Sequence, residues 1–273
     1  MQKKADLHVH TSFSDGTFSP AEVVEYAEKI GLSAIAITDH DSVEGIGPTL
    51  EAAKDSNLEI IPGIEFTTEI EDREVHILGF FIDYKQKWLI KELKNLCRLR
   101  EKRMRRMLDC LLKFGISLEL DEVRVIAGKG SLGRLHLATL LYQKGYVASI
   151  QEAFYKFIGN GKPCYVRGDR ISPLKAISMI DRLGGVSVLA HPYTLGMDEL
   201  IPRFVKGGLK GIEVYHSDHT GAAASHYKKI ADDFGLLTTG GSDCHGMGKG
   251  KILMGSVTVP YEVVDRLKEA AGK

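Results

Sequence analysis

The sequence predicts an α/β barrel with an inserted helical segment, and three features of the 273-residue chain support this fold class. Short apolar runs alternate with helix-like segments in the first and last parts of the chain. These runs are hydrophobic throughout, which is typical of parallel strands covered on both faces. The middle of the chain, residues 85–164, is rich in helical patterns instead. Repeated strand–helix units form a barrel or a doubly wound sheet, and we favour the barrel.

The first part of the chain contains four predicted strands. "ADLHV" is the first strand, and the helix "SPAEVVEYAEKIG" follows it. Ser19 as N-cap, Pro20 at the first helical position and Glu22 as the partner in a capping box mark the beginning of this helix, and Gly31 marks its end. Then come the strand "SAIAIT", a helix near residues 45–55, and the strands "LEIIPG" and "VHILGFFI".

The helical insertion, residues 85–164, is predicted to be a subdomain set into a barrel of residues 1–84 and 165–273. Its opening stretch, "KQKWLIKELKNLCRLREKRMRRMLDCLLKFG", has apolar residues at helical spacing, which indicates a buried face. These residues are Leu89, Leu93, Leu96, Met104, Met107, Leu108 and Leu111. After the insertion, the strands "GGVSVLA", "GIEVY", "GLLTTGG" and "GSVTV" are separated by helical stretches that begin near Ser172, Asp198, Ala222 and Tyr261.

The composition excludes some classes of protein. Lysine plus arginine and aspartate plus glutamate number 36 each, so no overall charge indicates nucleic acid or membrane, and any anion site must be local. The first residues lack the apolar run of a signal peptide, and no apolar stretch approaches the length of a membrane span. The four cysteines (Cys97, Cys110, Cys164 and Cys244) show no CxxC spacing and no paired framework. We therefore expect reduced thiols in a cytoplasmic protein with no membrane contact and no obligate protein partner.

Nine imidazole and carboxylate side chains fall at predicted strand ends or within a predicted strand. They are His8, His10, Asp15, His40, Glu65, His76, His191, Asp243 and His245. Because the carboxyl ends of parallel strands converge at one mouth of a barrel, these groups are expected to meet there. So many imidazoles and carboxylates tolerate one another only with cations between them. Nine ligands exceed the needs of one ion, so two or three ions of zinc, manganese or iron are predicted.

Each of these features alone also has an ordinary structural explanation. An HxH pair on a strand is weak evidence for a metal, His76 alone fits a buried core histidine, and Glu65 alone fits a cap or a salt bridge. The coincidence of all nine at predicted strand ends is what favours the metal site. Among the other histidines, His226 is expected on a solvated helix face. For His216 and His219, lining the barrel mouth and facing away from it are equally open.

The signatures "DLHVHTSFSDG", "TDHD", "GIE", "AHP" and "GSDCH", in this order, resemble those of the PHP (polymerase and histidinol phosphatase) metal-dependent phosphoesterases. The resemblance implies a distorted (β/α)7 barrel with a trinuclear metal centre. The helical insertion resembles the branch that acts on nucleotides, whose relatives dephosphorylate nucleoside 3′,5′-bisphosphates or trim RNA from its 5′ end.

The resemblance also implies how three ions would be shared among the nine ligands. The first ion would be held by His8, His10, Glu65 and Asp243. Glu65 would bridge to the second ion, held also by His76 and His191. The third ion would be held by Asp15, His40 and His245. Every ligand position of the family is filled in this sequence.

The expected reaction is attack of a metal-bridging hydroxide on a phosphate monoester, most specifically nucleoside 3′,5′-bisphosphate to nucleoside 5′-monophosphate. By the resemblance, Arg134 and His136 in "GSLGRLHLA" would contact the substrate phosphate, although Arg134 alone also fits a surface ion pair. His219 is the candidate catalytic residue, either protonating the leaving oxygen or holding a phosphate.

Other functions remain open at this point. A 5′-to-3′ exoribonuclease would use the same chemistry on short RNA, and an open groove lined by the basic stretch "CRLREKRMRRM" would favour it. That stretch more commonly forms a solvated helix face, but it could attract a second phosphate or RNA through Arg103 and Arg106. A C–N hydrolase of the amidohydrolase type is disfavoured because Glu65, not a lysine, occupies the bridging position. A structural metal module is disfavoured by the complete ligand set.

Overall fold

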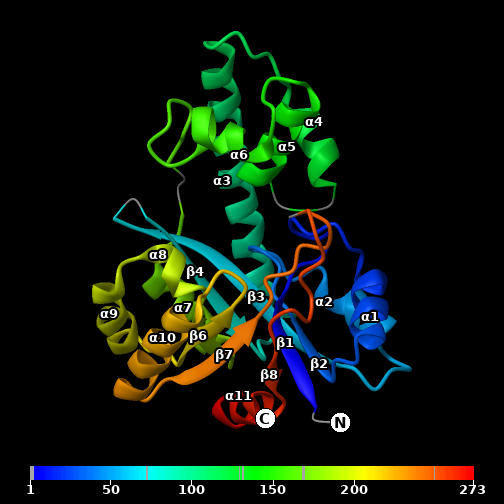
Figure 1. Ribbon diagram of the computed structural model, residues 1–273, viewed down its shortest axis with the longest axis vertical. Coiled ribbons are helices and arrows are strands. Elements are labelled where there is room, and N and C mark those ends of the chain that lie inside the picture. Colours follow the sequence, from blue (N-terminus) through cyan, green and yellow to red (C-terminus); the bar gives the residue numbers. More distant parts are fainter. Residues whose placement is uncertain (1–2, 72, 129, 131, 168–169, 249) are drawn as a thin grey trace.

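The protein is described by a computed structural model that covers residues 3–71, 73–128, 130, 132–167, 170–248 and 250–273. Its eight strands form one sheet in the order β7-β6-β5-β4-β3-β2-β1-β8 (Figure 1). Their bounds are β1 Lys4–Val9, β2 Ala34–Ile37, β3 Glu59–Ile70, β4 Arg73–Phe80, β5 Val186–Leu189, β6 Gly211–His216, β7 Leu237–Gly241 and β8 Val259–Pro260. Beyond β7 the chain returns to β1, where the His10 N–H donates to the Cys244 carbonyl at 2.9 Å. The sheet is therefore nearly closed, and the predicted barrel is confirmed.

Helices pack around this barrel. They are α1 Pro20–Lys29, α2 Ile46–Ala52, α7 Pro173–Arg182, α8 Pro192–Leu195, α9 Ile201–Lys206, α10 Gly221–Asp233 and α11 Glu262–Ala270, with a 3-10 turn at Asp198–Leu200. The predicted capping box of α1 is present, because the Ser19 hydroxyl accepts from the Glu22 N–H and the Glu22 carboxylate accepts from the Ser19 N–H. Local sequence chemistry thus determined where this helix begins.

The expectation of parallel strands throughout is wrong for the middle of the sheet. β3 pairs with β4 in antiparallel fashion, and β4 pairs with β5 in the same way. Only two residues separate β3 from β4, which is enough for a hairpin but too short for a parallel crossover. Glu65 consequently lies inside its strand rather than at a strand end, and His76 lies within β4, as expected. Because β4 runs against its neighbours, its first half lies beside the second half of β3, where Thr67 faces His76.

The helical insertion contains α3 Lys87–Leu112, α4 Leu120–Ala127, α5 Arg134–Gln143, α6 Ile150–Ala153 and a π-helical turn at Phe154–Ile158. Figure 1 shows α3 rising out of the barrel, with α4, α5 and α6 gathered around its far end. All seven apolar residues predicted to be buried on α3 are buried. Those in its first half pack into the barrel core and those in its second half into a separate core within the insertion. That the insertion is a subdomain of its own stays a prediction.

The prediction of unpaired cysteines is wrong for Cys110 and Cys164, which form a disulfide with their Cα atoms 5.4 Å apart. The two residues are separated by 54 positions in the sequence, so local spacing could not show that they meet. The disulfide joins α3 to the segment that follows the π-helical turn. Along the described chain, no helix combines the length and apolar character that a membrane crossing requires.

Candidate metal centre

A single carboxylate, that of Glu65 in β3, lies at the middle of the candidate site and is fully buried. Five imidazole rings surround it, those of His8, His10, His40, His76 and His191. Oε2 of Glu65 lies 3.2 Å from a nitrogen of each of the first three rings. Oε1 lies 2.7 Å from Nδ1 of His76 and 3.1 Å from Nε2 of His191. The carboxylate is therefore placed to bridge two groups of imidazoles.

Asp243, which follows β7, completes one of these groups. Its Oδ1 lies 3.4 Å from Nε2 of His8 and 3.1 Å from Nε2 of His10. Potential ligand atoms of His8, His10, Glu65 and Asp243 all lie within 4.8 Å of one another. This is the set that the resemblance assigned to the first ion. The backbone of Asp243 has a φ of 52°, a left-handed value that places strain at the site.

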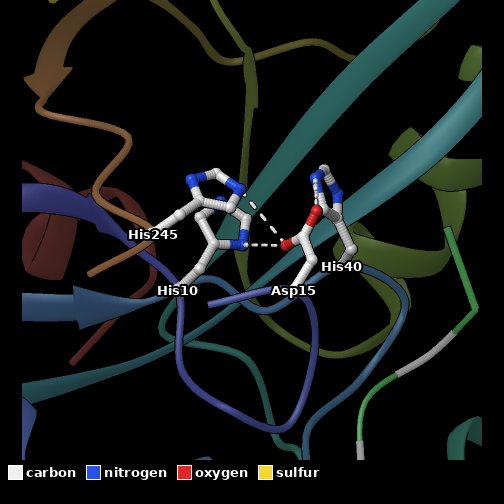
Figure 2. Close-up of side chains that lie close together, drawn as sticks. All are labelled: His10, Asp15, His40 and His245. Carbon is white, nitrogen blue, oxygen red and sulfur yellow. Dashed lines mark ion pairs between the residues drawn. The ribbon is translucent and has the colours of Figure 1, made fainter. Parts of the chain in front are cut away.

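A second cluster forms around Asp15 in the loop between β1 and α1 (Figure 2). Its Oδ1 lies 3.2 Å from Nε2 of His245 and 3.7 Å from Nδ1 of His10, and its Oδ2 lies 3.9 Å from Nε2 of His40. The structure thus brings together all nine side chains predicted from the sequence. His10 contributes to both clusters, because each of its ring nitrogens faces a different one.

Burial and mutual attraction govern ionisation in this site. Burial alone would raise the pKa of Glu65, but the surrounding imidazoles, foremost those of His40 and His76, hold it well below its usual range. Burial disfavours charge on His10 and His76, yet the nearby carboxylates raise their pKa values to about 9 and about 10. For His40, burial prevails and lowers the pKa to about 3. The buried carboxylates therefore need positive charge close to them, which protonated imidazoles or bound cations can supply.

Two buried atoms in these clusters have no hydrogen-bond partner, Nε2 of His10 and Oδ1 of Asp15. A buried polar atom without a partner is costly unless something else binds it. Imidazole nitrogens and carboxylate oxygens that converge in this way are the donor set preferred by zinc, manganese and iron. The residues therefore fit divalent metal ions. The number and identity of those ions stay predictions.

Three further carboxylates hold the proposed ligands in place, and the sequence reasoning missed them. Oε1 of Glu213 lies 3.0 Å from Nδ1 of His8, and Oε1 of Glu74 lies 3.0 Å from Nε2 of His76. The Asp39 carboxylate accepts from the Thr11 N–H at 2.7 Å, which fixes the start of the loop that carries Asp15. Such outer partners orient metal ligands and set the tautomer of a histidine. One signal was present, because "GIE" occurs at 63–65 and again at 211–213.

His216 ends β6 and His219 follows it, and the two rings differ in tautomer. Nδ1 of His216 accepts from the Asp218 N–H, so its proton lies on Nε2, which faces Oδ2 of Asp243 at 3.5 Å. His216, one of the two histidines whose position the sequence left open, lines the metal hollow. Nδ1 of His219 instead donates to the Val214 carbonyl at 2.8 Å, and its Nε2 is buried without a hydrogen-bond partner. Burial also lowers the pKa of His219, so its neutral form carries a lone pair on Nε2.

The first turn of α5 lies against the metal centre. Leu135 lines a hollow of about 240 Å³ together with the proposed metal ligands. Before it, Arg134 donates to Oε2 of Glu74 at 2.7 Å, which places the guanidinium one carboxylate away from His76. After it, Nδ1 of His136 accepts from the Gly133 N–H at 3.1 Å, so the proton lies on Nε2. Arg134 and His136 thus flank the hollow as donors, although neither lines it directly.

The basic stretch of α3 is less solvated than expected. Arg100 donates to the Asp41 carboxylate and to the Thr67 hydroxyl, and Arg103 is buried and donates to the Val166 carbonyl at 2.7 Å. The expectation of a solvated face is therefore wrong for these two arginines. Arg105 and Arg106 are exposed. The cationic residues of α3, all within the described chain, do not line the metal hollow.

Comparison with known proteins identifies the family. The family model described as PHP domain matches residues 6–151. The chain belongs to the PHP domain family. A 5′-3′ exoribonuclease of Haemophilus influenzae is 34% identical over 96% of this chain and 99% of its own. A 3′,5′-nucleoside bisphosphate phosphatase of Chromobacterium violaceum is 33% identical over 90% of this chain and 88% of its own.

Solved structures agree with this assignment. A protein of Bifidobacterium adolescentis, described as a proposed metal-dependent phosphoesterase, superposes with a TM-score of 0.89 and 31% identity, covering 97% of this chain and 96% of that one. This PHP protein is therefore a metal-dependent phosphoric ester hydrolase, as the sequence predicted. The roles of its individual site residues remain predictions from the sequence and the geometry.

Proposed function

We propose that this PHP phosphoesterase removes a phosphate from a small nucleotide, converting nucleoside 3′,5′-bisphosphate into nucleoside 5′-monophosphate. The observation that carries the proposal is the hollow of about 240 Å³ at the proposed metal ligands, which is lined by Leu135 of α5 and by none of the cationic residues of α3. A hollow of this size suits a terminal phosphate, whereas a groove along the basic helix would suit a polynucleotide. The bisphosphate phosphatase of Chromobacterium violaceum supports the same substrate class.

The proposed metal ligands are the nine residues around Glu65 and Asp15. When bound there, divalent ions supply an activated water nucleophile and neutralise charge on the phosphate. The chain itself supplies the remaining contacts. The guanidinium of Arg134 offers donors in a fork that matches phosphate oxygens, while Glu74 fixes its direction. The Nε2–H of His136 offers a neutral donor on the other flank, because burial lowers the pKa of this ring.

His219 is proposed to protonate the leaving oxygen through Nε2. That nitrogen carries a lone pair in the neutral ring, so it must first gain a proton. A phosphate dianion bound nearby favours the imidazolium form and raises the pKa of His219. The proton on Nε2 can then pass to the departing oxygen, while Nδ1 remains bonded to the Val214 carbonyl.

A second candidate function is 5′-to-3′ hydrolysis of short RNA. The Haemophilus influenzae relative, which bears that name, is similar to this chain along nearly its whole length. The chemistry at the phosphate would be the same, and only the size of the leaving fragment would differ. C–N hydrolysis receives no support from the site, because no lysine is found among the described residues that line the metal hollow.

The proposal is tested by measuring phosphate release with added Mn²⁺ from adenosine 3′,5′-bisphosphate and from a short 5′-phosphorylated RNA. We expect adenosine 5′-monophosphate and inorganic phosphate from the first substrate. His10→Ala should lower the rate about a thousandfold or more, because His10 faces both ligand clusters. His226→Ala is the matched control, since this histidine is exposed, hydrogen-bonds to Asp198 and does not line the metal hollow. Release of nucleotides from RNA without release of phosphate from the bisphosphate would favour the exoribonuclease instead.

A further inference from the structure

A second hollow, of about 770 Å³, adjoins the metal hollow. The two share Asp15 and Leu135 among the residues that line them, so they lie side by side at these two residues. One wall of the second hollow is the loop over residues 12–20 of the barrel. The opposite wall is formed by the end of α4 and by α5 of the helical insertion. Clefts between two packed parts of a protein are common places for a ligand.

One face of α5 follows this hollow away from the metal centre. Its residues His136, Thr139, Tyr142 and Gln143 all line the hollow. Because they recur three or four positions apart, they lie along one side of the helix. From His136 to Gln143 the helix extends about 10 Å. A substrate whose phosphate lies at the metal centre would therefore have its remaining part beside this face.

Two large apolar side chains are exposed in the hollow. Tyr142 is 50% exposed and Met247, in the loop after β7, is 54% exposed. The Met247 N–H donates to the Thr17 hydroxyl at 2.8 Å, which ties this loop to the barrel wall. Ile126 and Ile150 also line the hollow. Apolar side chains from separate segments that remain exposed around one space are typical of a binding site rather than of a core.

The polar groups of the hollow are mostly uncharged. Among the lining residues that the structure describes, there is no lysine or arginine, and the only carboxylate is Asp15 of the metal centre. The described walls therefore match a flat, uncharged ring better than a second phosphate. Gln143 is exposed, and a carboxamide can both donate to and accept from the edge of a base.

We propose that this hollow holds the nucleobase of the substrate, with the Tyr142 ring and the Met247 side chain against the faces of the base and Gln143 at its edge. The inference rests on the proposed function, because it names where the nucleoside of a nucleotide substrate lies. Stacking of a base on an aromatic side chain is sequence-tolerant, so the site would accept more than one base.

The first test compares Tyr142→Ala with Tyr146→Ala, a control just beyond the end of α5 that is 40% exposed but does not line the hollow. Tyr142→Ala should raise the KM for adenosine 3′,5′-bisphosphate about tenfold. It should leave the inhibition constant of inorganic phosphate unchanged, because phosphate alone does not reach the hollow. Tyr146→Ala should change neither value. Equal changes in both constants, or no change in either, would overturn the proposal.

The second test does not depend on turnover. Binding of adenosine to the metal-free protein is followed by saturation-transfer NMR, and we expect transfer to the protons of the base that Tyr142→Ala and Met247→Ala both weaken. Adenosine that does not bind, or that binds all variants equally, contradicts the base site even if the bisphosphate is hydrolysed. Adenosine binding that depends on Tyr142 without hydrolysis of the bisphosphate would instead contradict the proposed function alone.

Discussion

The barrel mouth and the helical insertion face the same cleft but are built in different ways. At the mouth, the groups are buried and held from two sides, as His8 is between Glu65 and Glu213. On α5, Tyr142 is half exposed, and the guanidinium of Arg134 is held by other side chains, namely Asn160, Glu74 and the Phe154 and Tyr165 rings. The difference indicates that the barrel fixes the chemistry, whereas the insertion determines which molecule is accepted.

The energetic basis of this difference is the cost of burying charge. Each carboxylate at the mouth must be paired, since an unpaired buried charge costs several kcal/mol. Such a network changes little between one substrate and another. Exposed side chains on α5 carry no such constraint, so substitution there costs little stability. Variants of the barrel mouth should therefore lose catalytic rate or metal affinity, whereas variants of α5 should lose substrate affinity.

The largest effect in this comparison is expected for His219→Gln. If His219 protonates the leaving oxygen, its loss should lower kcat about a hundredfold or more. The wild-type kcat/KM should fall as pH rises through the pKa of His219 in the free enzyme, which burial places below the ordinary 6.5. The fall in kcat should begin at higher pH, because bound phosphate raises that pKa. His219→Gln should lack both falls, and unchanged pH profiles would show that another group is the acid.

An intermediate effect is expected for Glu213→Gln. This variant keeps the size of the side chain but removes the charge that supports His8 and so weakens metal binding. Loss of such an outer partner typically costs about tenfold to a hundredfold in metal affinity. Titration with Mn²⁺ would measure the change, and excess Mn²⁺ should restore activity. Glu199→Gln, an exposed residue, serves as the control; equal affinities in the two variants would contradict the role assigned to Glu213.

The smallest effect is expected for Arg134→Lys on the insertion side. Lysine keeps the charge but cannot hold Glu74 and a phosphate oxygen in the same fork. We expect KM for the bisphosphate to rise roughly fivefold while kcat stays close to that of the wild type. Arg105→Lys, on an exposed arginine of α3, is the control. A decrease confined to kcat would instead show that Arg134 acts in the chemical step, and would contradict the division of roles between the barrel and the insertion.

Much of the barrel could be predicted because its signals are local. The capping box at Ser19 and the apolar runs act over a few neighbouring residues. The antiparallel pair β3–β4 was missed because its first half resembles a buried parallel strand. Only the stretch "FTTEIEDREVHI", which alternates around a charged turn, indicates a hairpin. Recognition of that pattern would have predicted that the strand containing His76 runs antiparallel to the strand containing Glu65.

Eight of the nine proposed metal ligands could be predicted because each lies in a short motif, and His76 could be added because it lies in a predicted strand, whereas the supporting carboxylates were missed. Glu74 lies two positions before His76 in β4, so strand alternation could have placed these two side chains on one face. Glu213, by contrast, contacts His8 across 205 positions of sequence. The pairing of Cys110 with Cys164 was missed for the same reason. Contacts of this kind depend on how distant segments pack, which residue spacing does not encode.

Helix α3 belongs to both parts of the molecule. Its 26 residues make a rod of about 39 Å, with Leu89, Leu93 and Leu96 in the barrel core and Met104 and Leu111 in the core of the insertion. No loop interrupts it, so it offers no hinge about which the insertion could swing. The width of the cleft is then a fixed dimension, and enzymes with other substrate sizes would evolve from this one through changes to side chains along α5 rather than through domain closure.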